Sequence, residues 1–174
     1  MAVFKPTWFV QAIYGLTPER LQEQGIKAIL TDLDNTLIAW DNPDGTPALH
    51  QWLQRMHAAG ITVMVVSNNN HRRIARALAK LDLPFVSRAL KPLPVGVDRA
   101  RKQLHLGKHE VVMIGDQLLT DVMAGNAAGV RTILVRPLVK TDAWNTRINR
   151  FLEKFVFMLL GGKKSLTYKE DLHG

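Results

Sequence analysis

Four carboxylate side chains follow two apolar segments of this 174-residue chain at short spacing. Asp32 and Asp34 come directly after the first apolar segment. Asp116 closely follows the second, and Asp121 lies five residues further on. Carboxylates that are brought together repel one another unless a cation lies between them, and oxygen ligands with several waters suit Mg²⁺. Because a carboxylate can also attack phosphorus, we expect Mg²⁺-dependent phosphoryl chemistry if the fold gathers these groups.

Polar groups that can hold a phosphoryl group lie between the two acidic pairs. Ser67 and Asn68 follow the apolar segment 61–66, and Lys91 lies in the loop before an expected helix. A lysine and a hydroxyl stabilise the charge of a transferring phosphoryl group. Ser67 and the asparagines after it also suit a helix cap, and a helix N-terminus binds anions as well. We expect Ser67 and Lys91 to hold the phosphoryl oxygens.

The first two aspartates suit different steps of a hydrolysis. Asp32 is the natural nucleophile because it is the last residue off a buried strand and is held rigidly. Asp34 lies two residues further on, at the start of a loop. From there it can protonate the leaving oxygen as general acid and then serve as general base for the attacking water.

Alternating apolar segments and helical patterns predict the fold that must position these groups. We expect strands at 27–31, 61–66, 84–86, 110–114 and 131–135, and helices at 46–59, 71–81, 94–104 and 120–128. Continuous apolar strands between amphipathic helices are typical of a parallel sheet covered on both faces. Right-handed crossovers make such a sheet doubly wound, or Rossmann-like, and ligands bind beyond the carboxyl ends of its strands. The polar groups named above all follow those ends, so the α/β fold predicts one site.

These residues resemble the motifs of the haloacid dehalogenase superfamily. The run Asp32-Leu33-Asp34-Asn35-Thr36-Leu37 is similar to its first motif, and Ser67, Lys91 and the run from Gly115-Asp116-Gln117 to Asp121 are similar to its second, third and fourth. The sequences Ser67-Asn68-Asn69 and Lys91-Pro92 resemble the corresponding motifs of the YqeG-type phosphatases of subfamily IIIA. The match spans about residues 26–136. It implies an Mg²⁺-dependent hydrolase of phosphoric monoesters that works through an aspartyl-phosphate.

The resemblance also implies a role for each acidic residue. Asp32 would be the nucleophile and a metal ligand. Asp34 would be the acid/base and would ligate the metal through its backbone carbonyl. Asp116 would complete the metal site, and Asp121 would orient a metal-bound water or Lys91.

Four further polar residues have binding or supporting roles under the same resemblance. Ser67 and Lys91 would bind the phosphoryl group, and Asn68 would contact the substrate. Thr36 would form a local hydrogen bond that shapes the first loop.

The gaps between the motifs are too short for a cap domain. One expected helix separates the first motif from the second, and another separates the third from the fourth. Larger members of the superfamily close such caps over small substrates. An open site fits a substrate that is large or lies on a surface. We expect one domain of residues 1–174 with a core of about 26–136 and flanking segments 1–25 and 141–174.

The charge of the chain suggests an anionic partner. Lys and Arg number 23 against 15 Asp and Glu, which gives a net charge of +8. No cysteine is present, which excludes a disulfide scaffold and a Cys-ligated zinc. The chain has neither an apolar run of membrane-spanning length nor a secretory leader, so we expect it in the cytoplasm.

The flanking segment 141–174 has apolar residues at roughly helical spacing with basic residues among them. Such a helix can lie on the anionic inner face of a membrane, or it can pack against its own core or a second subunit. YqeG-type proteins are similar to mitochondrial enzymes that dephosphorylate phosphatidylglycerophosphate. This resemblance implies a lipid phosphate as one substrate that an open, basic enzyme would suit.

Two other functions share parts of this pattern. A signalling receiver domain also has a doubly wound sheet and a phosphorylated aspartate, but it keeps its aspartyl-phosphate, which an acid/base at Asp34 would hydrolyse. A nucleic-acid-binding protein would suit the net charge of +8. Because the basic residues are scattered without a recognition motif, we expect no nucleic acid partner.

Overall fold

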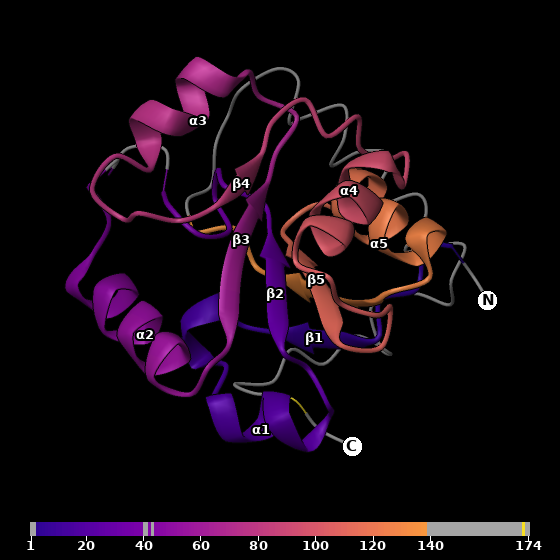
Figure 1. Cartoon of the computed structure of the whole chain (residues 1–174), viewed down its shortest axis with the longest axis horizontal. Helices are drawn as coiled ribbons and strands as arrows, with labels where there is room; N and C mark the ends of the chain where they lie inside the picture. Colours follow the sequence, from indigo (N-terminus) through magenta and orange to yellow (C-terminus); the bar gives the residue numbers. More distant parts are fainter. Residues whose placement is uncertain (1–2, 40–41, 43, 139–171, 173–174) are drawn as a thin grey trace.

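The protein is built on a single parallel sheet (Figure 1). The computed structural model describes residues 3–39, 42, 44–138 and 172. Its strands are β1 (Trp8–Val10), β2 (Ala28–Thr31), β3 (Thr62–Val66), β4 (Phe85–Val86), β5 (Val111–Gly115) and β6 (Arg131–Val135). They lie in the order β1-β6-β5-β2-β3-β4, and every pair is parallel. The predicted α/β doubly wound fold is therefore confirmed.

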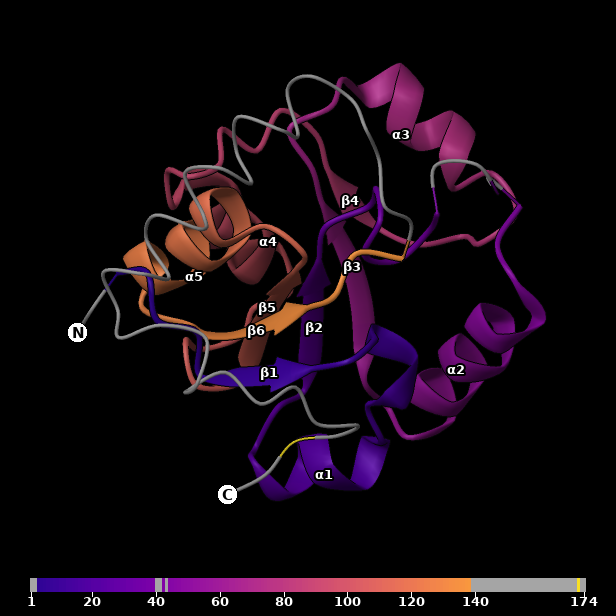
Figure 2. The same cartoon turned by 180° about the vertical axis from the view of Figure 1, so that it is seen from behind.

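Helices cover both faces of this sheet, with α2 on one side and α4 and α5 on the other (Figures 1 and 2). They are α1 (Pro18–Glu23), α2 (Pro47–Ala58), α3 (His71–Ala77), α4 (Val95–Gln103) and α5 (Met123–Ala128). A 3₁₀ turn at Ile13–Gly15 and a π-helical turn at Leu118–Val122 complete the described elements. Among the described helices, only α2 lies between β2 and β3, and only α4 lies between β4 and β5. These are the two gaps between motifs, so the described residues agree with a core that has no cap domain.

Alternation along the strands divides the core into two layers. Ile29 and Val63 face the layer that contains the fully buried Trp52 of α2. Leu30 and Met64 face the opposite layer, which contains residues of α4 and α5. Successive side chains of a strand point to opposite faces, so strands that are apolar throughout are buried on both sides.

The sheet extends beyond the range that we predicted for it. β1 pairs with β6 at the edge, with Trp8 in register with Ile133, although our expected core begins near residue 26. Periodicity gives little signal in a strand of three residues. Helix α3 ends at Ala77 rather than at the predicted residue 81, because the chain continues as turns before it reverses at Asp82, whose φ is 48°.

The N-terminal segment is tied to the core by two aromatic side chains. The indole Nε1 of Trp52 donates a hydrogen bond of 2.9 Å to the Leu16 carbonyl. The Tyr14 hydroxyl donates a bond of 2.6 Å to the carbonyl of Leu37, in the loop that follows β2. Residues 8–25 therefore belong to the folded unit rather than to a loose flank.

The C-terminal part of the chain is described only at Leu172. This side chain is 5% exposed and belongs to the same core layer as Trp52. The expected helix within 141–174 otherwise lies outside the described residues. Among the described residues, every helix is too short or too polar to span a bilayer.

Candidate active site

The carboxyl ends of the central strands bring the predicted site residues to one edge of the sheet. Strand β2 lies between β3 and β5, and Thr31 of β2 is in register with Ile114 of β5. The ladder continues one residue further, because the Asp32 amide donates to the Ile114 carbonyl at 2.9 Å. Asp32 therefore leaves the centre of the sheet next to the end of β5, which leads to Asp116, and the end of β3, which leads to Ser67.

Lys91 joins two of the aspartates. Its Nζ lies 2.7 Å from Asp32 Oδ1 and 2.6 Å from Asp121 Oδ1, and its side chain is 2% exposed. Burial by itself lowers the pKa of the ammonium group, but the charges of Asp121 and Asp32 outweigh burial and raise the pKa above its usual value. The two carboxylates therefore favour the charged form of Lys91, which contacts Asp32.

Three carboxylates crowd this edge. Oxygen atoms of Asp32, Asp116 and Asp121 all lie within 4.8 Å of one another. Burial raises the pKa of Asp32 to about 6, since the charge of Lys91 lowers the pKa less than burial and the charge of Asp121 together raise it. Burial and the charges of Asp121 and Asp32 likewise raise the pKa of Asp116 to about 8. The cluster holds more negative charge than Lys91 balances.

This donor set fits a divalent cation. No lysine or arginine of the described residues pairs with Asp116. Both oxygens of Asp121 accept hydrogen bonds: Oδ1 accepts from Lys91 Nζ, and Oδ2 accepts from the backbone amide of Gln117 at 3.1 Å. Carboxylate oxygens are the ligands that Mg²⁺ prefers. Asp32 and Asp116 are therefore the carboxylates that suit a metal ion, and Asp121 holds Lys91.

A glycine makes room for Asp121. A Cβ atom added to Gly115 would overlap the Asp121 side chain. Asp121 lies in the π-helical turn, where the Val122 amide donates to the carbonyl of Gln117, five residues back. Such turns are frequent at functional sites. Gly115 is a positioning residue that sequence reasoning treated only as part of a motif.

Two supporting residues make contacts other than those we expected. The Asn68 side chain brackets the backbone of Lys91: its Nδ2 donates to the Lys91 carbonyl at 2.9 Å, and its Oδ1 accepts from the Lys91 amide at 2.8 Å. These bonds occupy the amide that we expected to contact substrate. Thr36 Oγ1 donates a hydrogen bond of 3.2 Å to Asp116 Oδ1. This bond joins residues that are 80 positions apart in the sequence, whereas we expected a local bond within the first loop.

Ser67 directly follows β3, which ends at Val66. It is 2% exposed, and its Oγ accepts a hydrogen bond of 3.2 Å from the Asn69 amide. Of the residues that we considered for the helix cap, Ser67 and the asparagines after it, Asn70 makes the cap: its Oδ1 accepts from the backbone amide of Arg73 at 2.9 Å. Asn70 therefore caps the helix, and the phosphoryl contact of Ser67 stays a prediction.

The Asp34 carboxylate is held by two side chains that sequence reasoning missed. Asn69 Nδ2 donates to its Oδ2 at 2.8 Å, and Arg73 Nη2 lies 3.2 Å from both oxygens. From the sequence, Arg72, Arg73 and Arg76 suit a solvated face that can also attract anions to the rim of the site, but this pattern does not itself indicate the contact between Asp34 and Arg73. The position of Arg73 in the first turn of the helix that follows β3, at the same edge as the aspartates, is the signal that could have identified it.

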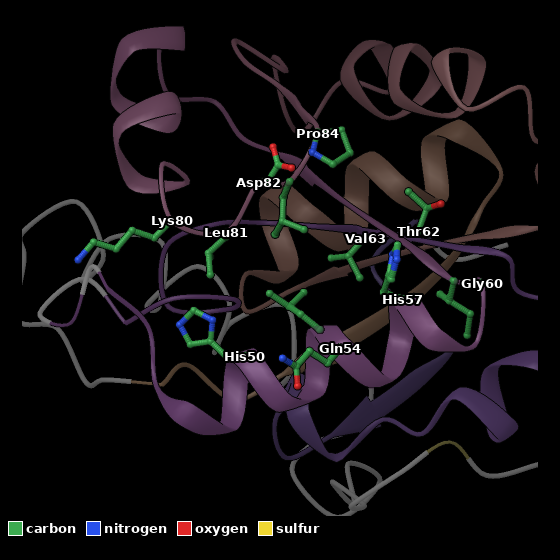
Figure 3. A pocket seen from close by; sticks show the side chains of 13 residues that line it. His50, Gln54, His57, Gly60, Thr62, Val63, Lys80, Leu81, Asp82 and Pro84 are labelled. Carbon is green, nitrogen blue, oxygen red and sulfur yellow. The ribbon is translucent and has the colours of Figure 1, made fainter.

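A groove of about 640 Å³ lies elsewhere on the molecule. Figure 3 shows His50 and His57 of α2 on one side of it and Asp82 and Pro84 on the other. Thr62, at the start of β3, also lines the groove. Because the carboxylates gather at the opposite ends of the strands, this groove is not part of the acidic site.

Fold and site together define the class of protein. A family model described as haloacid dehalogenase-like hydrolase matches residues 3–129, and the chain belongs to this family. It is 44% identical over 167 residues to the probable phosphatase YqeG of Bacillus subtilis (strain 168), a match that covers 96% of this chain and 97% of that protein. The resemblance that we drew from the motifs is therefore confirmed.

Two more distant similarities are informative. The chain is 28% identical over 133 residues to phosphatidylglycerophosphate phosphatase 1, chloroplastic/mitochondrial, of Arabidopsis thaliana, covering 71% of this chain and 38% of that protein. An uncharacterized protein from Listeria monocytogenes serotype 4b has a similar structure, with a TM-score of 0.54 and 16% identity. That match covers 68% of this chain and 84% of the other, and it shows the fold alone.

Proposed function

We propose that this hydrolase is a phosphatase of phosphoric monoesters that works through an aspartyl-phosphate on Asp32. The observation that carries the proposal is the buried Lys91 ammonium, 2.7 Å from Asp32, in a cluster that also includes Asp116. In this arrangement the groups that we propose as nucleophile, phosphoryl-binding cation and metal ligands lie within a few ångströms of one another. The similarity to the Bacillus phosphatase supports it.

In the first step an oxygen of Asp32 attacks phosphorus, and the bond from phosphorus to the leaving alcohol breaks. Lys91 holds the other carboxylate oxygen and so fixes the direction of attack. The Asp34 carboxyl group gives its proton to the leaving oxygen, so that a neutral alcohol departs. Lys91 and Ser67 hold the equatorial oxygens of the phosphoryl group.

In the second step Asp34 takes a proton from a water molecule as that water attacks the aspartyl-phosphate. The bond between phosphorus and Asp32 breaks, which releases inorganic phosphate and restores the Asp32 carboxylate. Asp34 then carries the proton for the next cycle. When bound at Asp32 and Asp116, Mg²⁺ supplies charge neutralisation for the phosphoryl oxygens.

We further propose that the substrate is a lipid phosphate and that the chain lies peripherally at an anionic membrane. Three observations support this substrate: the net charge of +8, the single helices that separate the motifs in the described part of the chain, and the similarity to the plant phosphatidylglycerophosphate phosphatase. We retain the expectation that nucleic acid is not a partner, and oligomerisation stays an expectation for the flanking segments.

Hydrolysis of a panel of phosphate esters tests the proposal. The panel contains generic esters, sugar phosphates and lipid phosphates in anionic vesicles, and phosphate release is measured for the wild type and Asp32→Asn. We expect the wild type to release phosphate, with the highest rate on a lipid phosphate, and the variant to release none while its circular dichroism stays unchanged. Turnover by the folded variant would remove Asp32 as the nucleophile.

A further inference from the structure

Exposed apolar side chains gather in the segment that carries Lys91. Four large apolar side chains are exposed among the residues that the structure describes, and three of them, Leu90, Leu93 and Val95, lie within six residues of one another. They are 56%, 56% and 50% exposed, whereas the Lys91 side chain among them is buried. A single exposed apolar side chain is ordinary on a protein surface, but a cluster of them marks a contact with a partner or a membrane.

Backbone hydrogen bonds bring these three residues together. The Leu93 amide donates to the Leu90 carbonyl at 2.9 Å, which closes a turn with these two residues at its ends. The Gly96 amide donates to the Ala89 carbonyl at 3.1 Å, so Leu90 and Val95, the neighbours of the bonded pair, also lie close together. We refer to Leu90, Leu93 and Val95 as the apolar patch.

The backbone beneath the apolar patch is firmly held. The Ala89 amide donates to the Ser67 carbonyl at 3.0 Å, and the Asn68 side chain bonds both backbone groups of Lys91. Leu90 has a φ of 59°, a left-handed conformation that a bulky residue rarely adopts and that persists where the surroundings fix it. The fold thus fixes a leucine in an unfavourable backbone conformation without burying its side chain, which indicates a role outside the core.

Exposed basic side chains lie beside the apolar patch. Arg88 is exposed two residues before the patch, and Arg99 Nη2 of α4 donates to the Arg88 carbonyl at 3.4 Å. Arg99 and Lys102 line a hollow together with the last residue of the patch. Asp98 also lines this hollow, but it pairs with Arg101 at 3.3 Å. The surroundings of the patch therefore carry a net positive charge.

This combination fits an anionic bilayer better than a protein partner. Apolar side chains with basic neighbours are typical of a surface that enters the headgroup region of an anionic membrane. A standard protein interface buries roughly 800 Å² on each side, which is more than three partly exposed side chains supply. The patch also follows the carboxyl end of β4, at the edge of the parallel sheet that carries the acidic cluster.

We propose that the apolar patch is a docking surface that inserts into the headgroup region of an anionic bilayer, while Arg88, Arg99 and Lys102 contact the lipid headgroups. The inference rests on the peripheral membrane location in the proposed function, and it identifies the face of the protein that makes the contact. Because Lys91 lies between two residues of the patch, docking through this face holds the acidic cluster at the level of the headgroups.

A fluorescent label tests the docking surface on the full-length protein. The chain has no cysteine, so Leu93→Cys accepts a single environment-sensitive label, and Val3→Cys is the control because Val3 is 42% exposed outside the patch. The vesicles contain phosphatidylserine and phosphatidylcholine, which have no phosphomonoester, so binding is independent of turnover. We expect the emission at residue 93 to shift to shorter wavelength and to be quenched by spin-labelled lipid, and the emission at residue 3 to stay unchanged. The same response at both positions, or none at residue 93, would overturn the proposal.

Vesicle binding of unlabelled variants measures what the patch contributes. Leu93→Gln combined with Val95→Thr should lower the partition coefficient on the order of 10-fold, because less apolar surface leaves water. Val3→Thr, the matched control for Val95→Thr, should leave it unchanged. Lys102→Gln should lower it about fivefold on the anionic vesicles and should have no effect on phosphatidylcholine alone. Thermal unfolding followed by circular dichroism shows that each variant is folded.

The outcomes separate this inference from the proposed function. Wild-type binding that the patch variants do not weaken refutes the docking surface and leaves the peripheral location in place, whereas the absence of any binding refutes both. Phosphate release is measured separately on a soluble ester, so a failure of the phosphatase proposal does not change the binding result. A label at residue 93 that is shielded without vesicles, in a protein whose oligomeric mass falls with Leu93→Gln, assigns the patch to an interface between copies and refutes membrane docking.

Discussion

The change Asp121→Asn tests how the buried ion cluster is held together. Asparagine keeps the size of the side chain and an oxygen for the Gln117 amide, but it removes the charge that faces Lys91. The two side chains are 1% and 2% exposed, and Nζ lies 2.6 Å from Oδ1. The substitution therefore leaves a buried ammonium with Asp32 as its remaining partner at 2.7 Å.

The size of the effect follows from this burial. Removing one partner of a buried ion pair costs about 3–5 kcal/mol. We expect the lower end, about 3 kcal/mol, because Lys91 keeps Asp32 and because Asp32 and Asp116 lose the repulsion of a neighbouring charge. In a chain of this size 1 kcal/mol corresponds to about 2–4 °C, so the melting temperature should fall by roughly 6–12 °C.

The assay is thermal unfolding in excess chelator, followed by circular dichroism. Glu23→Gln is the control, since Glu23 pairs with Arg20 at 3.1 Å and their side chains are 59% and 57% exposed. An exposed pair of this kind contributes below about 1 kcal/mol. If Asp121→Asn melts within the small shift of the control, the buried pair does not stabilise the fold and our account of the cluster is wrong.

Two further outcomes test the metal site and the glycine. Excess chelator should stop phosphate release and added Mg²⁺ should restore it, because Asp116 has no cationic side-chain partner among the described residues; turnover in chelator would contradict the metal site. Gly115→Ala should lower kcat at least tenfold by displacing Asp121. Gly107→Ala, where the added atom meets only the flexible end of Glu110, should leave kcat unchanged, and equal rates in the two variants would refute the argument.

The fold could be predicted from the sequence because its inner strands are buried on both faces. Such strands appear as continuous apolar runs, and the chirality of parallel crossovers then allows few arrangements. The edge strand β1 is three residues long and has no comparable signal. Its place depends on Trp8 and Val10 packing in the core, which a local pattern does not show.

The site could be predicted as a set of residue types but not as a set of contacts. The order of the strands brings Asp32 and Asp116 together, and strand order follows from the fold. The partner of Asn68 depends on the path of a loop 23 residues away. Arg73 lies on a helix surface whose orientation is decided by packing, so its contact with Asp34 became visible only in three dimensions.

The hydrogen bond from Tyr14 to the Leu37 carbonyl has a consequence for any shortened version of this protein. A chain trimmed to begin at residue 26 would keep every acidic side chain of the site. It would lose the phenol that braces the backbone just after Thr36, together with the strand that closes one border of the sheet. The described residues 3–25 thus support the site from outside, because none of the contacts of the acidic cluster comes from their side chains.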